Sequence, residues 1–330
     1  MKRPIAAVTG TGYSVPRHVM TNHDFAAIGI ETSHEWIFER SGIVQRHIAR
    51  DGESTCSLAA DASRKAMQKA GITAAEIDAI ILSTATPDRL LPATAVDVQA
   101  ALGATRATAF DISAACSGWI YGLTIAEGLI AAGTIETALV VGAEKMSAII
   151  DWQDRSTAVL FGDGAGAAIV RRGDGTRGIL SAFMRSDGGL SELLWRPSGG
   201  AAAPFSLPVL EDRSSYVRMA GREVFRHAVR SMAEACDRAL DGARLTGKDI
   251  DLLIPHQANL RINQYIQNEV LKLPDSKFIH NIQRYGNTTA ATIPSLLHEA
   301  VETGRLKKGM KVACVAFGSG FTWGSAIIDW

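Results

Sequence analysis

The sequence has no excess of charge of either sign and no long apolar run. The chain has 34 lysines and arginines together and 34 aspartates and glutamates together, so the formal net charge of the 330 residues is zero. Such a balance gives no global sign of binding to nucleic acid or to an acidic membrane surface. No apolar stretch reaches about 18 residues, the length that a membrane-spanning helix needs, and no signal-peptide pattern follows the N-terminus. We therefore expect a cytoplasmic protein that binds neither nucleic acid nor membrane, and any acidic partner has to meet a local basic patch.

Cysteine is also scarce, which limits the sites that it can form. The four cysteines, at positions 56, 116, 236 and 314, form no Cys-x-x-Cys pair and no zinc-ribbon spacing. A reduced protein without a metal is the simplest interpretation. The hydrophobic fraction of 47% and the charged fraction of 21% are typical of an α/β enzyme with a large core.

Short apolar segments with strand character alternate with helical patterns along the chain. The predicted strands are residues 6–9, 79–84, 107–112, 138–142, 158–161, 165–171, 179–185, 252–255, 277–280, 311–317 and 324–329. The predicted helices are residues 54–70, 93–102, 117–132, 221–240, 258–271 and 294–303. This alternation favours βαβ units with antiparallel additions.

An internal repeat predicts that the fold is duplicated. Residues 72–80 match residues 245–253, and in each segment a threonine, Thr73 or Thr246, can cap a short helical turn before a strand. Residues 140–142 match residues 316–318 at nearly the same separation. One such match arises by chance about as often as not, but two at one spacing favour duplication. We place the boundary between the halves near residues 173–178.

Cys116 is the first candidate for chemistry. The predicted strand 107–112 ends shortly before it and a helical pattern follows it, which places the thiol at a helix N-terminus. Unpaired N–H groups and the helix dipole at such a position favour the thiolate. The small residues on either side leave room for a substrate, but they suit a tightly packed, buried structural thiol equally well.

His256 and Asn287 are the second and third candidates. His256 follows the predicted strand 252–255, where α/β folds build their sites, although a single histidine there is more often part of the core. Asn287 lies in Gly-Asn-Thr-Thr, a pattern that also suits an ordinary turn. Each candidate lies at the end of an element in a different part of the chain. A thiolate with two neutral hydrogen-bond donors predicts acyl transfer through a covalent thioester.

Taken with these residues, motifs along the whole chain resemble those of the β-ketoacyl-acyl carrier protein synthase III family, in the thiolase-like superfamily. The matching segments are Thr9-Gly10-Thr11-Gly12, Thr21-Asn22, His34-Glu35-Trp36-Ile37, Arg46-His47-Ile48-Ala49, Phe161-Gly162-Asp163-Gly164-Ala165-Gly166-Ala167, Ile254-Pro255-His256-Gln257-Ala258-Asn259, Gly286-Asn287-Thr288 and Phe317-Gly318-Ser319-Gly320-Phe321-Thr322-Trp323-Gly324. The resemblance implies an α/β, duplicated thiolase-like fold of five α-β-α-β-α layers with a mixed sheet in each half. It implies halves of residues 1–175, which carry the cysteine, and 176–330, which carry His256, Asn287 and the terminal glycine loop.

The resemblance also implies a reaction. Cys116 takes an acyl group from an acyl-CoA, and malonyl-acyl carrier protein then loses CO2 and condenses with it, which starts type II fatty acid synthesis without a cofactor. Neutral His256 and Asn287 hold the enolate oxygen, and the backbone N–H groups of Cys116 and Ser319 are candidates for a second oxyanion hole. The family often has three glycines at Gly318-Ser319-Gly320, so Ser319 is strained if its φ is positive.

Residues that bind the substrates follow from the same resemblance. Trp36 and Arg40, assisted by Arg155, are expected to hold the nucleotide end of coenzyme A, unless they are an ordinary surface aromatic with solvated charges. The remaining expected contacts are Asn259 in the pantetheine channel, Phe225 and Ala258 as further substrate-binding residues, Arg222 where the family commonly has asparagine, and Arg226 and Arg261 toward the acidic carrier protein.

Leu91 resembles the residue that closes the acyl pocket, partly from the other subunit of a homodimer. Leucine is smaller than the phenylalanine of acetyl-selective members, so we expect the pocket to accept longer or branched primers. A specialised ketosynthase that primes a polyketide, or an O- or N-acyltransferase, is the alternative. A degradative thiolase has a second cysteine where this chain has Ala316, and a non-catalytic relative would lack Cys116, His256 or Asn287.

Overall fold

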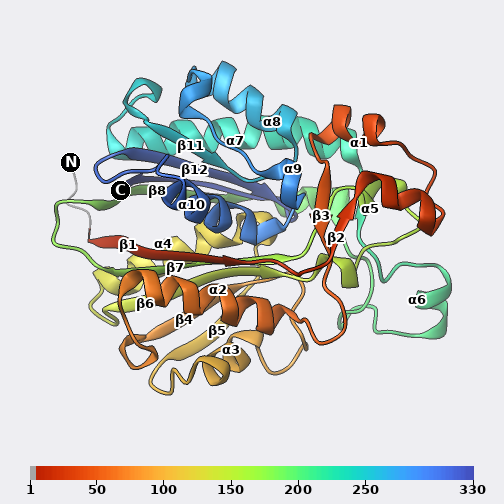
Figure 1. Ribbon diagram of the computed structural model, residues 1–330, viewed down its shortest axis with the longest axis horizontal. Helices are drawn as coiled ribbons and strands as arrows, with labels where there is room; N and C mark the ends of the chain where they lie inside the picture. The colour runs from red at the N-terminus through yellow and green to blue at the C-terminus, as the bar shows by residue number, and fades with distance from the viewer. Residues whose placement is uncertain (1–4) are drawn as a thin grey trace.

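Two mixed β-sheets lie face to face, with helices between them and on both outer faces (Figure 1). The computed structural model describes residues 5–330, so residues 1–4, the start of the predicted first half, lie outside the described residues. The strands are β1 (Ala6–Ser14), β2 (Val19–Thr21), β3 (Gln45–His47), β4 (Ala79–Ser83), β5 (Thr108–Ile112), β6 (Thr137–Glu144), β7 (Gly164–Arg172), β8 (Gly178–Ser186), β9 (Leu194–Trp195), β10 (Arg218–Met219), β11 (Leu252–Pro255), β12 (Lys311–Gly318) and β13 (Thr322–Asp329). The α-helices are α1 (His34–Ser41), α2 (Thr55–Ala70), α3 (Thr94–Leu102), α4 (Gly118–Ala131), α5 (Arg155–Ala158), α6 (Leu207–Glu211), α7 (Gly221–Ala243), α8 (Leu260–Tyr265), α9 (Ile282–Tyr285) and α10 (Thr292–Glu302).

Five layers alternate through the molecule, which confirms the predicted fold class. Apolar side chains of α2 and α3 pack on the outer face of the first sheet. Those of α4 and α10 fill the space between the two sheets. Those of α7 and α8 cover the outer face of the second sheet. Because α4 is buried between two sheets, its start, where Cys116 lies, is held from both sides.

The two sheets share a strand pattern. The first has the order β1-β7-β6-β4-β5 and the second the order β8-β13-β12-β11, each with two antiparallel pairings followed by a parallel one. Where the first sheet continues to β5, the second has only an isolated parallel bridge between Leu253 and Phe278. All strands of the first sheet lie within residues 6–172 and all strands of the second within residues 178–329. The boundary at residues 175 and 176 stays a prediction.

The repeated segments of the sequence form the same local structure in both sheets. Thr73 and Glu76 make a capping box around a short 3-10 turn that leads into β4. Thr246 and Asp249 make the same box before β11. The equivalence that the sequence repeat predicts is therefore present in the hydrogen bonds as well as in the strand order.

Several predicted elements are wrong. Residues 158–161 are not a strand: Asp154 caps the short helix α5, and only Phe161 makes a bridge, to Asn287. Residues 277–280 are not a strand either: Lys277 ends a 3-10 turn that begins at Asp275, and Phe278 makes a single bridge to Leu253. The predicted helix 258–271 begins at Leu260 and changes to a π-helix at Ile266–Leu271. Helix α1, which the periodicity missed, has Ser33 as its N-cap.

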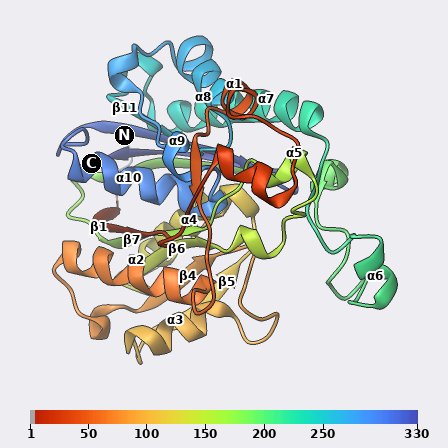
Figure 2. The same cartoon turned by 45° about the vertical axis from the view of Figure 1, so that its right-hand side comes forward.

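A flap of residues 188–220 lies beside the turn that carries Cys116. Its two short strands, β9 and β10, pair with each other, and α6 at its far end stands away from the body of the molecule (Figure 2). No helix among residues 5–330 has the length and apolar character to cross a bilayer.

Candidate active site

Cys116 lies in a tight turn between β5 and α4. The preceding Ala115 has a φ of 45°, and residues 115–117 form a 3-10 turn that leads directly into the helix. A Cβ on Gly318 would lie 2.6 Å from the backbone nitrogen of Cys116, so only glycine permits this approach of the terminal loop. The hydroxyl of Thr322 donates to the carbonyl of Ala114 over 2.8 Å and ties the two loops together.

The expected low pKa of Cys116 is wrong for the unliganded protein. Burial raises the pKa of the Cys116 thiol above its ordinary value, and the nearby Glu144 carboxylate raises it further. The residue is 7% exposed, and the loss of solvation raises the pKa of the thiol more than the backbone hydrogen bond at this turn lowers it. Cys116 is therefore a thiol at rest, and formation of its thiolate would need a base.

His256 is a buried, neutral imidazole. Burial lowers its pKa to about 3. Its backbone N–H donates to Val315, which fixes the residue at the end of β11. Its Nδ1 lies 2.7 Å from the hydroxyl of Thr292, while Nε2 has no partner in the described part of the chain. Nε2 is therefore the atom that can meet a substrate or the thiol.

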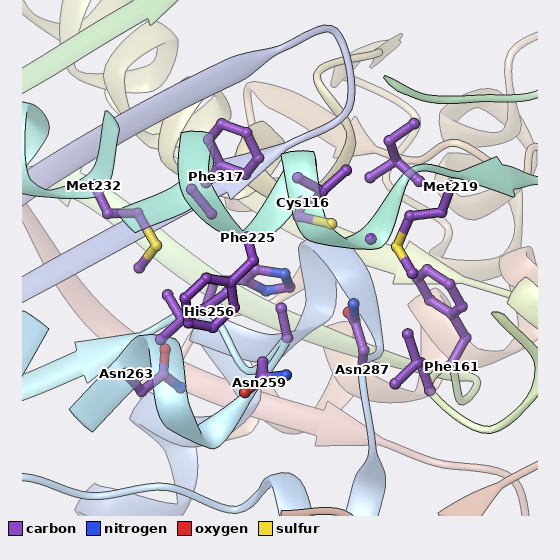
Figure 3. A pocket seen from close by; sticks show the side chains of 17 residues that line it. Cys116, Phe161, Met219, Phe225, Met232, His256, Asn259, Asn263, Asn287 and Phe317 are labelled. Carbon is purple, nitrogen blue, oxygen red and sulfur yellow. The ribbon is translucent and has the colours of Figure 1, made fainter. Parts of the chain in front are cut away.

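Asn287 presents its amide nitrogen to the same space. Its backbone N–H donates to Leu160, and its Oδ1 accepts from the backbone N–H of Thr289 over 2.8 Å. Because the oxygen is occupied, the amide is oriented with its N–H groups free to act as donors. Figure 3 shows this nitrogen pointing toward Cys116, with His256 beside it.

Two cavities meet at the thiol. One is lined by Cys116, His256, Asn287, Phe225, Ala258 and Asn259 (Figure 3). The other is also lined by Cys116, together with Ala85, Ser113, Met146, Val217 and Ser319, among others. The arrangement can therefore hold two groups near the sulfur, one in each cavity.

The first cavity continues to a mouth lined by arginines. Trp36, Arg40, Arg222, Arg226 and Arg261 line this mouth, and none of the described residues that line it is acidic. Phe225 and Asn259 line both the mouth and the inner cavity. A protein of zero net charge thus carries the local basic patch that an acidic partner requires.

Individual residues at the mouth also support one another. The guanidinium groups of Arg40 and Arg155 lie 4.4 and 4.6 Å from the centre of the Trp36 ring, as cation–π pairs. Asn259 caps α8 and donates to the carbonyl of Arg40 over 2.8 Å. Arg155 contacts Trp36 but is not among the residues that line the mouth.

Leu91 lies outside these cavities, whereas Ser319 lines one of them. Leu91 is 87% exposed and lines no cavity of its own chain among those described above. Ser319 lines the second cavity, and its φ is not positive, so the strain considered from the sequence does not arise. Its hydroxyl donates to the carbonyl of Leu194 in the flap.

Three residues that sequence reasoning missed shape the site. Thr292 contacts His256, and Asn263 lines the inner cavity. Glu144 is buried at the end of β6 and accepts hydrogen bonds from Thr86 and from the backbone N–H of Ala85. Burial raises the pKa of Glu144 to about 7. No local pattern marks these residues, because their roles come from contacts with distant segments.

Comparison with known proteins identifies the family of the chain. Residues 110–188 match the family described as 3-oxoacyl-(acyl-carrier-protein) synthase III, and residues 240–330 match the family described as its C-terminal part. A protein of Rhodospirillum centenum named β-ketoacyl-(acyl-carrier-protein) synthase III is 48% identical over 98% of this chain and 99% of its own length. The chain belongs to the β-ketoacyl-acyl carrier protein synthase III family.

Solved structures agree with this membership in the synthase III family. The 3-oxoacyl-(acyl-carrier-protein) synthase III of Aquifex aeolicus is 44% identical, with a TM-score of 0.91 over 98% of this chain and 100% of its own. The priming β-ketosynthase of the R1128 polyketide biosynthetic pathway is 34% identical, with a TM-score of 0.91 over 99% of this chain and 97% of its own. Within residues 5–330, no group of His, Cys, Asp or Glu is arranged to hold a metal ion.

Proposed function

We propose that this protein condenses an acyl-CoA primer with malonyl-acyl carrier protein, with loss of CO2, to give a β-ketoacyl-acyl carrier protein and so to start type II fatty acid synthesis. The observation that carries the proposal is the convergence of a thiol, a neutral imidazole with a free Nε2 and an amide nitrogen on one cavity. No group beyond these side chains is needed, so we propose that coenzyme A enters only as part of the substrate.

In the first half-reaction, Cys116 becomes acylated. As the sulfur attacks the thioester carbonyl, Nε2 of His256 takes the thiol proton and passes it to the coenzyme A sulfur that leaves, so that no imidazolium, which burial disfavours, persists. For Nε2 to accept a proton, Nδ1 has to carry one, and the oxygen of Thr292 accepts from it while the Thr292 hydroxyl donates to Thr289 over 3.0 Å. The backbone N–H groups of Cys116 and Ser319 are proposed to hold the tetrahedral oxyanion.

In the second half-reaction, the malonyl thioester loses CO2. The electron pair of the broken carbon–carbon bond moves to the thioester oxygen, and the enolate oxygen accepts from Nε2–H of His256 and from the amide of Asn287. The enolate carbon attacks the acyl-Cys116 carbonyl, and the thiolate that leaves takes up a proton from solvent, the one proton that the decarboxylating condensation consumes. The pKa of about 3 keeps the imidazole neutral, so it serves as a donor without becoming a competing cation.

The binding roles predicted from the sequence are part of the proposal. Trp36, Arg40 and Arg155 hold the nucleotide of coenzyme A. Phe225, Ala258 and Asn259 line the channel that its pantetheine arm occupies. Arg222, Arg226 and Arg261 provide positive charge for phosphates and for an acidic carrier protein, which agrees with the arginine-lined mouth. The protein works in the cytoplasm as a homodimer, in which exposed Leu91 reaches the second cavity of the partner subunit.

Intact mass measures the proposed function directly. Wild type and Cys116→Ala are exposed briefly to a panel of acyl-CoAs and then to malonyl-acyl carrier protein. We expect an acyl adduct on the wild type alone, discharged by the malonyl chase as a β-ketoacyl carrier protein. The second candidate is a specialised ketosynthase or O- or N-acyltransferase, and the likeness to a polyketide-priming ketosynthase favours it. An adduct that survives the chase supports the acyltransferase form of this candidate. No adduct at all contradicts both.

A further inference from the structure

Asn263 has an amide group without a partner inside the active-site cavity. The residue lies in α8, is 0% exposed, and neither its Oδ1 nor its Nδ2 forms a hydrogen bond within the described residues. It lines the same cavity as Cys116 and His256. Figure 3 shows it on the far side of His256 from Asn287.

A buried side-chain amide without any hydrogen-bond partner is unusual in a folded protein. Burial without a hydrogen-bond partner destabilises a polar group, whereas an apolar residue of similar size would leave no polar atom unpaired. The other buried atom without a partner in this cavity is Nε2 of His256, which the proposed reaction pairs with the substrate. The same reasoning assigns the Asn263 amide to a polar group of a substrate.

The surroundings of Asn263 define what that group is. Ala228, Met232, Ile262 and Phe317 line this part of the cavity with apolar side chains. None of the described residues that line the cavity is lysine or arginine. The site therefore offers one neutral donor and acceptor in a place that solvates charge poorly.

We propose that Asn263 positions the carboxylate of the malonyl group for its loss as CO2; this inference rests on the proposed function. With the thioester oxygen on His256 and Asn287, and the reacting carbon toward Cys116, the carboxylate is left to point past His256. There the amide N–H groups of Asn263 hold the carboxylate without the counter-charge that would stabilise it. The apolar cavity walls solvate charge poorly, so they favour loss of the carboxylate as neutral CO2. The electron pair of the broken carbon–carbon bond moves to the enolate oxygen.

The test separates the two half-reactions in Asn263→Leu. We expect acylation by acyl-CoA at the wild-type rate, and a condensation rate with malonyl-acyl carrier protein lower by about 10- to 100-fold, the range for a hydrogen bond to a charged group. Asn263→Asp places a carboxylate opposite the malonyl carboxylate, so it should lose more, and recover in part as the pH falls. The melting temperature of Asn263→Leu should not fall, because the substitution removes a buried polar group that has no hydrogen-bond partner.

Gln267→Leu is the matched control on the same helical segment. Gln267 is also a buried amide, but it donates to Leu273 and Asp275, and it lines none of the cavities described above. We expect this variant to lose stability and to keep the ratio of the two half-reactions. Wild-type condensation by Asn263→Leu, or equal slowing of both half-reactions, overturns the role of Asn263. Failure of the wild type to form an acyl adduct contradicts the proposed function instead.

Discussion

Nδ1 of His256 and Oγ1 of Thr292 lie 2.7 Å apart, and the same hydroxyl lies 3.0 Å from the carbonyl of Thr289. A hydroxyl can donate to only one of these acceptors at a time. When it donates to Thr289, Nδ1 carries the proton and Nε2 is free to act as a base. When it donates to Nδ1, Nε2 carries the proton and is a donor. Thr292 can therefore support both neutral tautomers of the His256 imidazole, one for each half-reaction.

Replacement of Thr292 by valine should slow both half-reactions while the fold persists. Valine keeps the shape of threonine but cannot form a hydrogen bond with the imidazole of His256. The orientation and tautomer of the imidazole are then no longer fixed, and we expect both rates to fall by about 10- to 100-fold. Thr292→Ser keeps the hydroxyl and should restore most of the rate. Stopped-flow half-reactions measure the rates, and 15N NMR of labelled imidazole reports the tautomer. Unchanged rates and an unchanged NMR spectrum in Thr292→Val would refute this role.

The raised pKa of Cys116 predicts an unusual pH dependence of alkylation. Because burial and Glu144 disfavour the thiolate, the rate of alkylation by iodoacetamide should keep rising beyond pH ~9, where an ordinary cysteine has levelled off. Glu144→Gln removes the negative charge and should raise the rate at pH 8. The Cys56→Ala background removes the more accessible thiol, and peptide mass identifies the adduct. A plateau near pH 7 would instead restore the low pKa expected from the helix N-terminus.

The lowered pKa of His256 predicts that acid destabilises the fold. The unfolded histidine titrates near 6.5 and the folded one at about 3, so its contribution is complete above pH 6.5 and is lost as the pH falls toward 3. Between pH 7 and 5 this loss is about 2 kcal/mol of unfolding free energy. His256→Gln should lack it, as denaturant titrations at both pH values can measure. If the two proteins respond equally to pH, the folded imidazole has a near-normal pKa.

The link between Ser319 and Leu194 predicts control of water access. The Ser319 hydroxyl holds the flap strand β9 against the terminal loop, and Leu194 lines both cavities at the thiol. Ser319→Ala removes a bond worth about 1 kcal/mol, so the flap should open about fivefold more often. We expect faster hydrolysis of the acyl-enzyme and faster hydrogen exchange in residues 188–220. Equal lifetimes of the acyl-enzyme, measured by intact mass, would count against this control.

Local signals explain which parts of the molecule could be predicted from sequence. Thr73 and Thr246 cap turns through neighbours three residues away, so the repeat was visible, and Cys116 and His256 were found because each follows a strand. Asn263 and Glu144 have no such signal, since their surroundings are assembled from segments far apart in the chain. The pKa of Cys116 was mispredicted for the same reason: the helix start is local, whereas burial between two sheets is not.

Leu91 leads to the prediction on primer choice. It is 87% exposed in its own chain, as a side chain that completes a partner's pocket should be. Leucine leaves more room than phenylalanine, so primers of about four to six carbons, or branched ones, should acylate the wild type better than acetyl-CoA. Leu91→Phe should shift this preference toward acetyl-CoA by about 10-fold or more, since each methylene in such a pocket is worth about 1–3 kcal/mol. Competition between acyl-CoAs, read as adduct masses, gives the preference directly. Mixed dimers of a Leu91→Phe subunit with a Cys116→Ala subunit test whether Leu91 acts across the interface. In such a dimer only the Leu91→Phe subunit has a cysteine at position 116, and its partner supplies a wild-type Leu91. This cysteine should keep the wild-type primer preference if Leu91 acts across the interface, and should change its preference if Leu91 acts within its own subunit.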